Sequence, residues 1–343
     1  MDTSTEPTPP LVIDFHCHML ERSVFEASTN RTVFTGFGAT PAKAPRPGAQ
    51  ELIERSFDPV KVIADMDARG IDMAVVSAST VLQGSSWADP ATDLALCQKC
   101  NDQAAAWVVR YPRRFIGSMV LPMQSIALAN AELERASQQL GLRVANLSSS
   151  YQGIYMGDPQ FHPFWEQVGG LGVTAWIHPE GVRDPWFQRY ALWNSAGQSI
   201  EETKCMTSLI YEGVMTKFPR LNVVMAHGGG YFPHYMGRMD RNTANRPDTV
   251  RNMDGQTPSS FLKRFYYDSC VYDPQVLKVL IERVGHDRIV MGSDYPVGEK
   301  DPVGWLKSCG LVGQPLADVA GGNAARLLGL VLPPEKIEAI SFS

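Results

Sequence analysis

Histidines and one aspartate recur in this sequence at the points where short apolar runs end. His16 and His18 close the run that begins at Leu11, while His178 and His227 each end a later run. Asp294 follows the last of these runs. Neutral imidazole and carboxylate are suitable ligands for zinc and similar divalent metals. If the fold brings these side chains together, they predict a site for one divalent ion.

The His16-Cys17-His18 motif alone is weak evidence, since two surface histidines on an edge strand would give the same pattern. In an extended chain, residues two apart share a face, so both imidazoles point the same way and Cys17 points away from them. Three more polar groups at later strand ends favour a metal site. Burying five ionisable groups without a metal or partners would be costly.

The elements that must position these residues are read from the apolar runs, which alternate with helical patterns. Runs such as LVIDF, MAVVS and NVVMA are continuous, which is typical of strands buried on both faces of a parallel sheet. Eight strand–helix repeats predict an α/β fold, a closed (β/α)8 TIM barrel, with an open doubly wound sheet as the alternative. A barrel carries its active site at the C-terminal ends of its strands, where the polar groups lie. The expected strands are Leu11–Phe15, Met73–Ser77, Phe115–Val120, Arg143–Leu147, Val173–Ile177, Asn222–Ala226, Phe265–Asp268 and Ile289–Gly292.

No break in composition marks a second domain. We expect one barrel domain over residues 11–335, after a disordered tail at 1–10. The segment Glu21–Phe57 is rich in Gly, Pro, Ala and Thr, which predicts a long insertion after the first strand, over the barrel mouth. A second irregular stretch is expected at Asp240–Pro258. Helices are expected at Pro59–Arg69, Ala91–Arg110, Ser125–Leu140, Pro159–Gly169, Ile200–Lys217, Pro274–Val284 and Ala317–Leu328.

Composition limits the partners and the compartment. The net charge of −5 argues against a nucleic-acid partner, because nucleic-acid binding requires a basic patch on the protein. No apolar run reaches the roughly 18 residues of a membrane span, and the polar N-terminus lacks the pattern of a signal peptide. Six scattered cysteines do not look like a disulfide scaffold, and Cys97 and Cys100 fit core packing on adjacent helical turns. We expect a soluble cytoplasmic protein with reduced thiols.

The residues around these candidates resemble the amidohydrolase superfamily, and within it the branch that contains aminocarboxymuconate-semialdehyde decarboxylase. The resemblance runs over most of the chain and includes DFHCHML, WIHPEG, MAHGGGYFPHYMGRMD and MGSDYP. It implies a (β/α)8 barrel with one metal ion, usually zinc, with manganese as an alternative. It also implies that His16, His18, His178 and Asp294 are metal ligands and that His227 is an acid/base beside the metal. His162, His234 and His286 are expected to be surface or packing residues.

The resemblance further implies how a substrate is held. Arg238 matches an arginine that reaches a substrate carboxylate across a dimer interface, so we expect a homodimer; the alternative is a surface arginine on a helix. An arginine suits this task because its fork binds both carboxylate oxygens. Trp193 is expected to be a pocket wall, and Asn194 makes that wall more polar than in the family. The expected partner is a small carboxylated substrate.

One family residue is missing. An arginine of the decarboxylase falls in register on Gln50, and neither Arg46 nor Arg55 matches it. The sequence therefore predicts a metal-dependent decarboxylase of a small aromatic or muconate-like carboxylic acid, not necessarily the muconate semialdehyde itself. His227 with Asp294 would protonate the carbon that loses carbon dioxide. The alternative is a metal-dependent hydrolase or hydratase acting on a carboxylated ring-cleavage intermediate. A barrel that only binds ligand is disfavoured, because every implied metal ligand is present.

Overall fold

The computed structural model describes residues 11–29, 31, 48–78, 87–182 and 184–330. Within them, eight parallel strands form one sheet in the order β1-β2-β3-β4-β7-β8-β9-β10, so each strand pairs with the next barrel strand along the chain. Backbone hydrogen bonds from Phe15 N to Met291 O (2.8 Å) and from His18 N to Tyr295 O (3.0 Å) connect the first strand to the end of the last. These bonds close the sheet, which confirms the predicted (β/α)8 TIM barrel and not the alternative of an open doubly wound sheet. The strands are β1 (Ile13–His18), β2 (Met73–Ser77), β3 (Phe115–Met119), β4 (Val144–Leu147), β7 (Thr174–Ile177), β8 (Asn222–Met225), β9 (Tyr266–Asp268) and β10 (Ile289–Val290).

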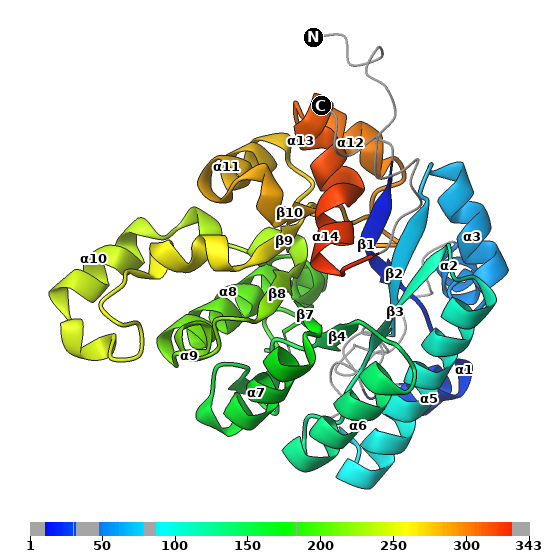
Figure 1. Ribbon diagram of the computed structural model, residues 1–343, viewed down its shortest axis with the longest axis horizontal. Helices are drawn as coiled ribbons and strands as arrows, with labels where there is room; N and C mark the ends of the chain where they lie inside the picture. Colours follow the sequence, from blue (N-terminus) through cyan, green and yellow to red (C-terminus); the bar gives the residue numbers. More distant parts are fainter. Residues whose placement is uncertain (1–10, 30, 32–47, 79–86, 183, 331–343) are drawn as a thin grey trace.

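Helices surround the ring of strands (Figure 1). The helices α3, α5 and α11 begin with the same signal, an aspartate whose carboxylate accepts a backbone N–H, followed by proline in the first turn. These caps are Asp58, Asp89 and Asp273. The helices are α1 (Arg22–Ser28), α2 (Ala49–Arg55), α3 (Pro59–Ala68), α5 (Pro90–Arg110), α6 (Ile126–Gln138), α7 (His162–Leu171), α8 (Ala196–Tyr211), α9 (Val214–Lys217), α10 (Gly237–Asn245), α11 (Pro274–Val284), α12 (Pro302–Ser308), α13 (Gly313–Ala317) and α14 (Asn323–Leu327).

Several bounds differ from the expectation. A two-stranded hairpin, β5 (Ser150–Tyr151) with β6 (Ile154–Tyr155), was not predicted. The stretch expected to be irregular after the sixth strand begins inside α10, which projects from the barrel in Figure 1. Six of the nine residues of α10 are polar and only Met239 and Ala244 have apolar side chains, too few to show the apolar period that reveals a helix. The predicted tail at 1–10, residues 30 and 32–47 of the predicted insertion, and the segment 331–335 lie outside the described residues.

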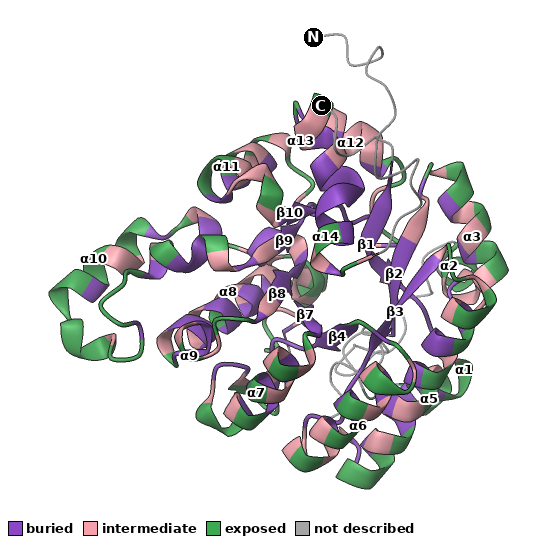
Figure 2. Ribbon diagram, in the orientation of Figure 1, coloured by how far each residue is buried: buried purple, intermediate pink, exposed green. Residues whose placement is uncertain are grey.

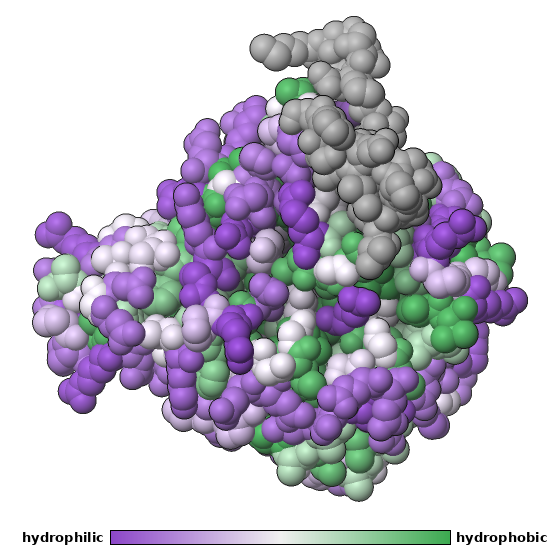
Figure 3. Space-filling view, in the orientation of Figure 1, coloured by the Kyte–Doolittle hydropathy of each residue, from purple (hydrophilic) through white to green (hydrophobic). Residues whose placement is uncertain are grey.

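Two layers of apolar side chains form the core. The larger layer lies between the strands and the outer helices, and the smaller one is built mainly from strand residues such as Phe15, Val144, Trp176 and Val224. Residues of α14 pack against the smaller layer. Figure 2 accordingly shows buried strands inside helices that are exposed on their outer faces. Polar side chains cover most of the outer helices on the face shown in Figure 3. No helix among the described residues is long and apolar enough to cross a membrane.

Candidate metal centre and active site

Three imidazoles and one carboxylate meet at the C-terminal ends of the strands. His16 and His18 belong to β1, His178 follows β7 and Asp294 follows β10. Nε2 of His16 lies 3.2 Å from Nε2 of His18, and Oδ1 of Asp294 lies 3.3 Å from both nitrogens. One ligand atom from each of the four residues lies within 4.8 Å of all the others. The structure therefore brings together the four residues expected to bind a metal.

A β-bulge in β1 aims the two histidines inward. Ile13 and Phe15 point into the inner core layer, so simple alternation would send His16 and His18 to the opposite face. The register between β1 and β2 shifts between Asp14 and Cys17, and this extra residue reverses the alternation. Cys17 accordingly packs in the outer layer. The expectation that both imidazoles share one face was right, but the bulge decides which face it is.

Asp14 holds this bulge in place. Its carboxylate accepts hydrogen bonds from the backbone N–H of His16 (3.0 Å), and from the N–H (2.9 Å) and Oγ (2.5 Å) of Ser293. Ser293 directly precedes Asp294, so one buried carboxylate connects the ends of the first and last strands. This connection fixes the distance between the histidine pair and Asp294.

Two contacts outside the cluster fix which ring nitrogen is free. Nδ1 of His16 lies 2.7 Å from Oδ2 of Asp268, and Nδ1 of His178 lies 3.0 Å from the carbonyl oxygen of Pro179. Because both partners are acceptors, each Nδ1 carries the proton and each Nε2 keeps a lone pair. Burial, and then the positive charge of nearby histidines, lowers the pKa of His178 well below its ordinary value. This ring is therefore neutral and able to act as a ligand.

This donor set fits a divalent metal. Metal–nitrogen and metal–oxygen bonds of about 2.0–2.2 Å place ligand atoms at adjacent tetrahedral positions roughly 3.3 Å apart. The distances of 3.2 and 3.3 Å between Nε2 of His16, Nε2 of His18 and Oδ1 of Asp294 match that spacing. Three imidazoles with one carboxylate suit zinc and related divalent ions. The geometry and the chemistry of the four residues agree on one ion.

His227 lies beside this cluster and is held by a glutamate. Its ring centroid lies 5.2 Å from that of His16 and 5.1 Å from that of His178. Its Nδ1 lies 2.5 Å from Oε1 of Glu202, a fully buried residue of α8. Although burial opposes a charged ring, the carboxylate of Glu202 raises the pKa of His227. The arrangement lets His227 carry a proton on Nε2 while Nδ1 remains bound to Glu202.

The three glycines after His227 allow the neighbouring elements to approach. A Cβ at Gly228 would lie 2.5 Å from the side chain of Val271, and one at Gly229 would lie 2.9 Å from Met206 Sδ. A Cβ at Gly230 would lie 2.2 Å from Ser199 O and 2.9 Å from Glu202 Oε2. All three glycines have positive φ. Larger residues here would push α8 away and with it the carboxylate that holds His227.

Sequence reasoning missed Glu202, Asp268 and Tyr272. Asp268 ends the seventh predicted strand, so the same criterion that selected the histidines could have selected it. Glu202 lies within a helix next to a second glutamate, and no local pattern distinguishes the two. Tyr272, in the loop after β9, donates a hydrogen bond from Oη to Oδ2 of Asp294 (3.1 Å). Its sequence context carries no signal for this contact.

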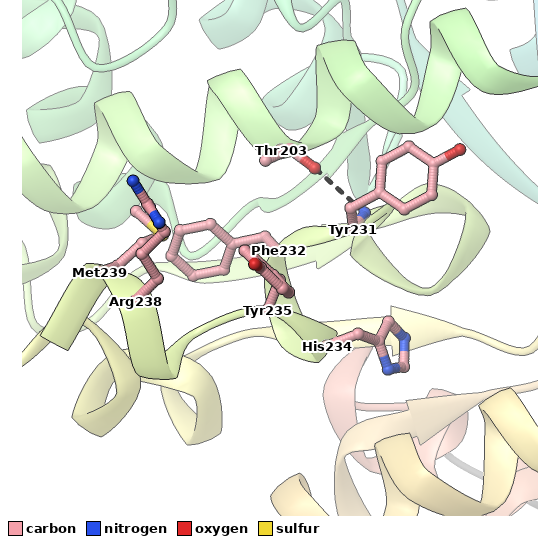
Figure 4. A pocket seen from close by; sticks show the side chains of 7 residues that line it. All are labelled: Thr203, Tyr231, Phe232, His234, Tyr235, Arg238 and Met239. Atoms are coloured by element: carbon pink, nitrogen blue, oxygen red, sulfur yellow. Dashed lines mark hydrogen bonds between the residues drawn. The ribbon is translucent and has the colours of Figure 1, made fainter. Parts of the chain in front are cut away.

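The expected substrate-binding residues do not gather around the cluster. Arg238 is exposed on α10 and lines a pocket of about 490 Å³ with residues of α8 and of the loop after β8. Figure 4 shows its side chain directed toward α8, with Phe232 and Met239 beside it. No residue of the metal cluster lines this pocket. The structure thus places Arg238 away from the cluster of its own chain. The full lining is Thr203, Tyr231, Phe232, His234, Tyr235, Arg238 and Met239.

Trp193 and Asn194 end the 3-10 helix η4 (Arg189–Asn194). The ring of Trp193 packs on Gly181, where a Cβ would lie 2.8 Å from it, so Trp193 contacts the loop that follows His178. Asn194 is exposed. Trp193 therefore packs against the loop that follows His178, and its role as a pocket wall stays a prediction.

The decarboxylase arginine that falls in register on Gln50 has no replacement among the described residues around position 50. Gln50 is exposed on α2. Arg55 forms an ion pair with Asp65, and Arg46 lies outside the described residues. His162, His234 and His286 stand apart from the metal cluster. All six cysteines are buried free thiols, so Cys97 and Cys100 pack in the core as expected.

The model of the amidohydrolase family matches residues 13–330, from the first barrel strand to the end of the last helix. The chain belongs to the amidohydrolase family. Every residue of the cluster described above lies within the matched segment of this amidohydrolase.

Several curated and solved relatives of this amidohydrolase are decarboxylases, and another curated relative, 26% identical over 66% of both chains, is 2-keto-4-carboxy-3-hexenedioate hydratase of Sphingobium. The chain is 33% identical to 2-amino-3-carboxymuconate-6-semialdehyde decarboxylase of Dictyostelium discoideum, over 82% of this chain and 79% of the relative. It is 27% identical to the structure of 5-carboxyvanillate decarboxylase from Sphingomonas paucimobilis, with a TM-score of 0.82 over 94% of this chain and 99% of the other. It is 25% identical to a dihydroxybenzoic acid decarboxylase from Polaromonas with bound manganese, with a TM-score of 0.78 over 97% and 99% of the two chains.

Proposed function

We propose that this amidohydrolase is a metal-dependent carboxy-lyase that removes carbon dioxide from a small aromatic or muconate-like carboxylic acid. One observation carries the proposal: the buried cluster of three histidines and Asp294 lies directly beside His227, whose Nδ1 is held by Glu202. The decarboxylases similar to this chain support the same reaction. Breakdown of aromatic compounds is the role that this chemistry fits.

His16, His18, His178 and Asp294 would hold the ion, and Nε2 of His16, Nε2 of His18 and Oδ1 of Asp294 are the atoms that face one another in the cluster. Zinc is the proposed native metal because imidazole nitrogens dominate the donor set, and manganese is the alternative that one similar structure supports. When bound, a divalent ion supplies an electrophilic centre that polarises substrate oxygens. The hydrogen bonds of His16 to Asp268 and of His178 to Pro179 keep these rings in the tautomer that binds a metal.

His227 is the proposed proton donor. Its Nδ1 stays bound to Glu202, so the transferred proton leaves from Nε2 and adds to the carbon that carries the substrate carboxylate. A π electron pair of the substrate forms the new carbon–hydrogen bond. When the bond between that carbon and the carboxylate breaks, its electron pair restores the π bond and carbon dioxide leaves. The carboxylate of Glu202 stabilises the protonated ring before transfer, and the ring regains its proton from water. Proton transfer of this kind suits a histidine near neutral pH.

A product analysis tests the reaction. The metal-loaded protein is expected to release one carbon dioxide for each substrate consumed from a panel of hydroxylated benzoates and carboxylated dienoates. Products are identified by mass, in water enriched in oxygen-18. Incorporation of water oxygen without release of carbon dioxide contradicts the decarboxylase and favours the hydrolase or hydratase. Oxygen-18 in the product distinguishes the two reactions. Hydration or hydrolysis adds an oxygen atom from water to the product, whereas decarboxylation adds only a proton.

We infer that a second copy of the chain completes the site. Arg238 lies on a helix that projects from the barrel, and Tyr231 and Tyr235 beside it are 50% and 70% exposed. Tyrosine and arginine are the residue types that contribute most to protein interfaces. In a two-fold dimer the same patch faces itself from both subunits, so each site would receive one arginine from its partner. This arginine would bind a substrate carboxylate. No arginine is present at position 50, where the family residue would fall, so a second cation is needed.

Subunit mixing tests Arg238. The Arg238→Ala variant should weaken substrate binding while metal content and folding stay unchanged. Mixing it with inactive His178→Ala should restore part of the activity, because each mixed dimer has one site with both defects and one with neither. Turnover and sedimentation of the mixtures are measured. A monomer in solution, or no recovery although the subunits demonstrably exchange, contradicts action across the interface.

The expected compartment is the cytoplasm, and a nucleic-acid partner is not expected. The six buried free thiols suit a reducing compartment, and the net charge is negative. Neither point affects the proposed chemistry.

A further inference from the structure

The two carboxylate oxygens of Asp294 have different partners. Oδ1 lies 3.3 Å from Nε2 of both His16 and His18, inside the metal cluster. Oδ2 accepts a hydrogen bond from the phenol Oη of Tyr272 at 3.1 Å. The phenol and the imidazoles therefore contact opposite oxygens of one group. A rotation of the carboxylate that moved Oδ1 out of the cluster would also break the bond to the phenol.

The backbone on both sides of this hydrogen bond has an unusual conformation. Tyr272 has φ of 54° and Asp294 has φ of 56°, in the left-handed region that bulky L-residues rarely adopt. Strained backbone of this kind persists only where the surroundings enforce it, and it gathers at functional sites. Both strained residues are the partners of this one bond.

Gly298 leaves the space that the phenol needs. A Cβ at this position would lie 2.3 Å from Ser293 O, 2.5 Å from Tyr272 Oη and 2.7 Å from Asp294 Cβ. A larger residue at 298 would therefore displace the backbone of Ser293 or one of the two hydrogen-bonded partners. Glycine at this position lets the chain pass close to the strand end and to this pair.

Core packing does not account for the pose of Tyr272. The residue is 51% exposed, whereas the side chain of Asp294 is only 18% exposed. A half-exposed tyrosine can turn into water at little cost, yet its hydroxyl faces the carboxylate. The phenol thus borders both the cluster and the solvent from which a substrate arrives.

We propose that Tyr272 is a positioning residue for the metal centre. Its hydroxyl holds Oδ2 of Asp294, so the carboxylate presents the single oxygen Oδ1 to the ion. This inference rests on the proposed function only in taking Asp294 as a ligand. Partners that orient a metal ligand typically contribute about 10- to 100-fold to metal affinity or activity. Tyr272 acts through Asp294 and has no contact with the imidazoles in this account.

The test compares Tyr272→Phe with Tyr295→Phe. The first variant removes only the hydroxyl on Oδ2 of Asp294, while the second removes a hydroxyl that donates to Asp65 (2.9 Å), from the residue next to Asp294. Zinc affinity is measured by competition with a chelator, alongside kcat, KM and Tm. For Tyr272→Phe we expect zinc to bind about 10- to 100-fold more weakly and kcat to fall while KM and Tm stay nearly unchanged. Tyr295→Phe should match the parent protein in zinc affinity.

A crystal structure of metal-free Tyr272→Phe shows the position of the Asp294 carboxylate directly. We expect Oδ1 of Asp294 to leave its position between His16 and His18. Parent-like zinc affinity together with an unmoved carboxylate overturns the inference, as does an equal loss of affinity in Tyr295→Phe. Failure to decarboxylate any substrate would contradict the proposed function but not this role, which affinity and the carboxylate position decide. A parent protein that binds no metal overturns the inference, because Asp294 would then not be a ligand.

Discussion

Replacing His16 with alanine should remove most of the bound metal and nearly all activity. His16 contributes Nε2 to the cluster, and its Nδ1 is bound to Asp268. The substitution therefore removes one ligand and also leaves the buried carboxylate of Asp268 without this partner. Loss of one ligand weakens metal binding, and the loss of a hydrogen-bond partner at Oδ2 of buried Asp268 adds a further cost.

Metal content per chain and turnover measure this effect. His162→Ala is the matched control, because His162 lies on the outer helix α7 and outside the cluster. Its variant should keep one ion per chain and parent-like turnover. Removing the metal with a chelator should reproduce the loss seen in His16→Ala, and adding zinc or manganese back should reverse it only in the parent protein. One tightly bound ion in His16→Ala would exclude this residue as a ligand.

The barrel could be predicted because its strands are buried on both faces. A strand such as Met73–Ser77 must then be apolar throughout, so it stands out from the polar helix surfaces around it. The polar residues that end such strands are conspicuous for the same reason. This is why the four residues of the cluster and His227 could be selected as a group from the sequence, whereas the choice of four ligands among the five came from the family resemblance. The bounds of the irregular stretch after β8 were wrong because α10 has only two apolar side chains, Met239 and Ala244, too few to indicate a helix.

Contacts between distant elements could not be predicted in this way. The bulge in β1 depends on how Asp14 bonds to Ser293, at the other end of the chain. Glu202 and its neighbour Glu201 are identical in type, and only tertiary packing sends one to His227 and the other to Tyr155. The hydrogen bond of Tyr272 requires two strained residues to meet. Local patterns identify residues at strand ends, whereas packing decides which partners hold them.

His227→Asn should separate chemistry from metal binding. Asparagine keeps a polar group that can still bond to Glu202, but it cannot carry a proton on a ring nitrogen. We expect about one ion per chain and a loss on the order of 10²-fold or more in kcat, the usual scale for a general acid or base. His227 lies beside the cluster but is not among the four residues that share its ligand geometry. Loss of the metal would make His227 a ligand, and unchanged turnover would remove it from the mechanism.

Two neighbouring glutamates refine this result. Glu202→Gln removes the charge that stabilises protonated His227, so kcat should fall on the order of 10-fold or more, with metal retained. Glu201→Gln is the matched control, since Glu201 lies on the same helix and is nearly as buried, but its carboxylate binds Tyr155 and Lys204. Nitrogen NMR of the His227 ring shows whether Nδ1 still carries the proton. Equal losses in both variants would mean that α8 was disturbed, because only Glu202 reaches the proton donor.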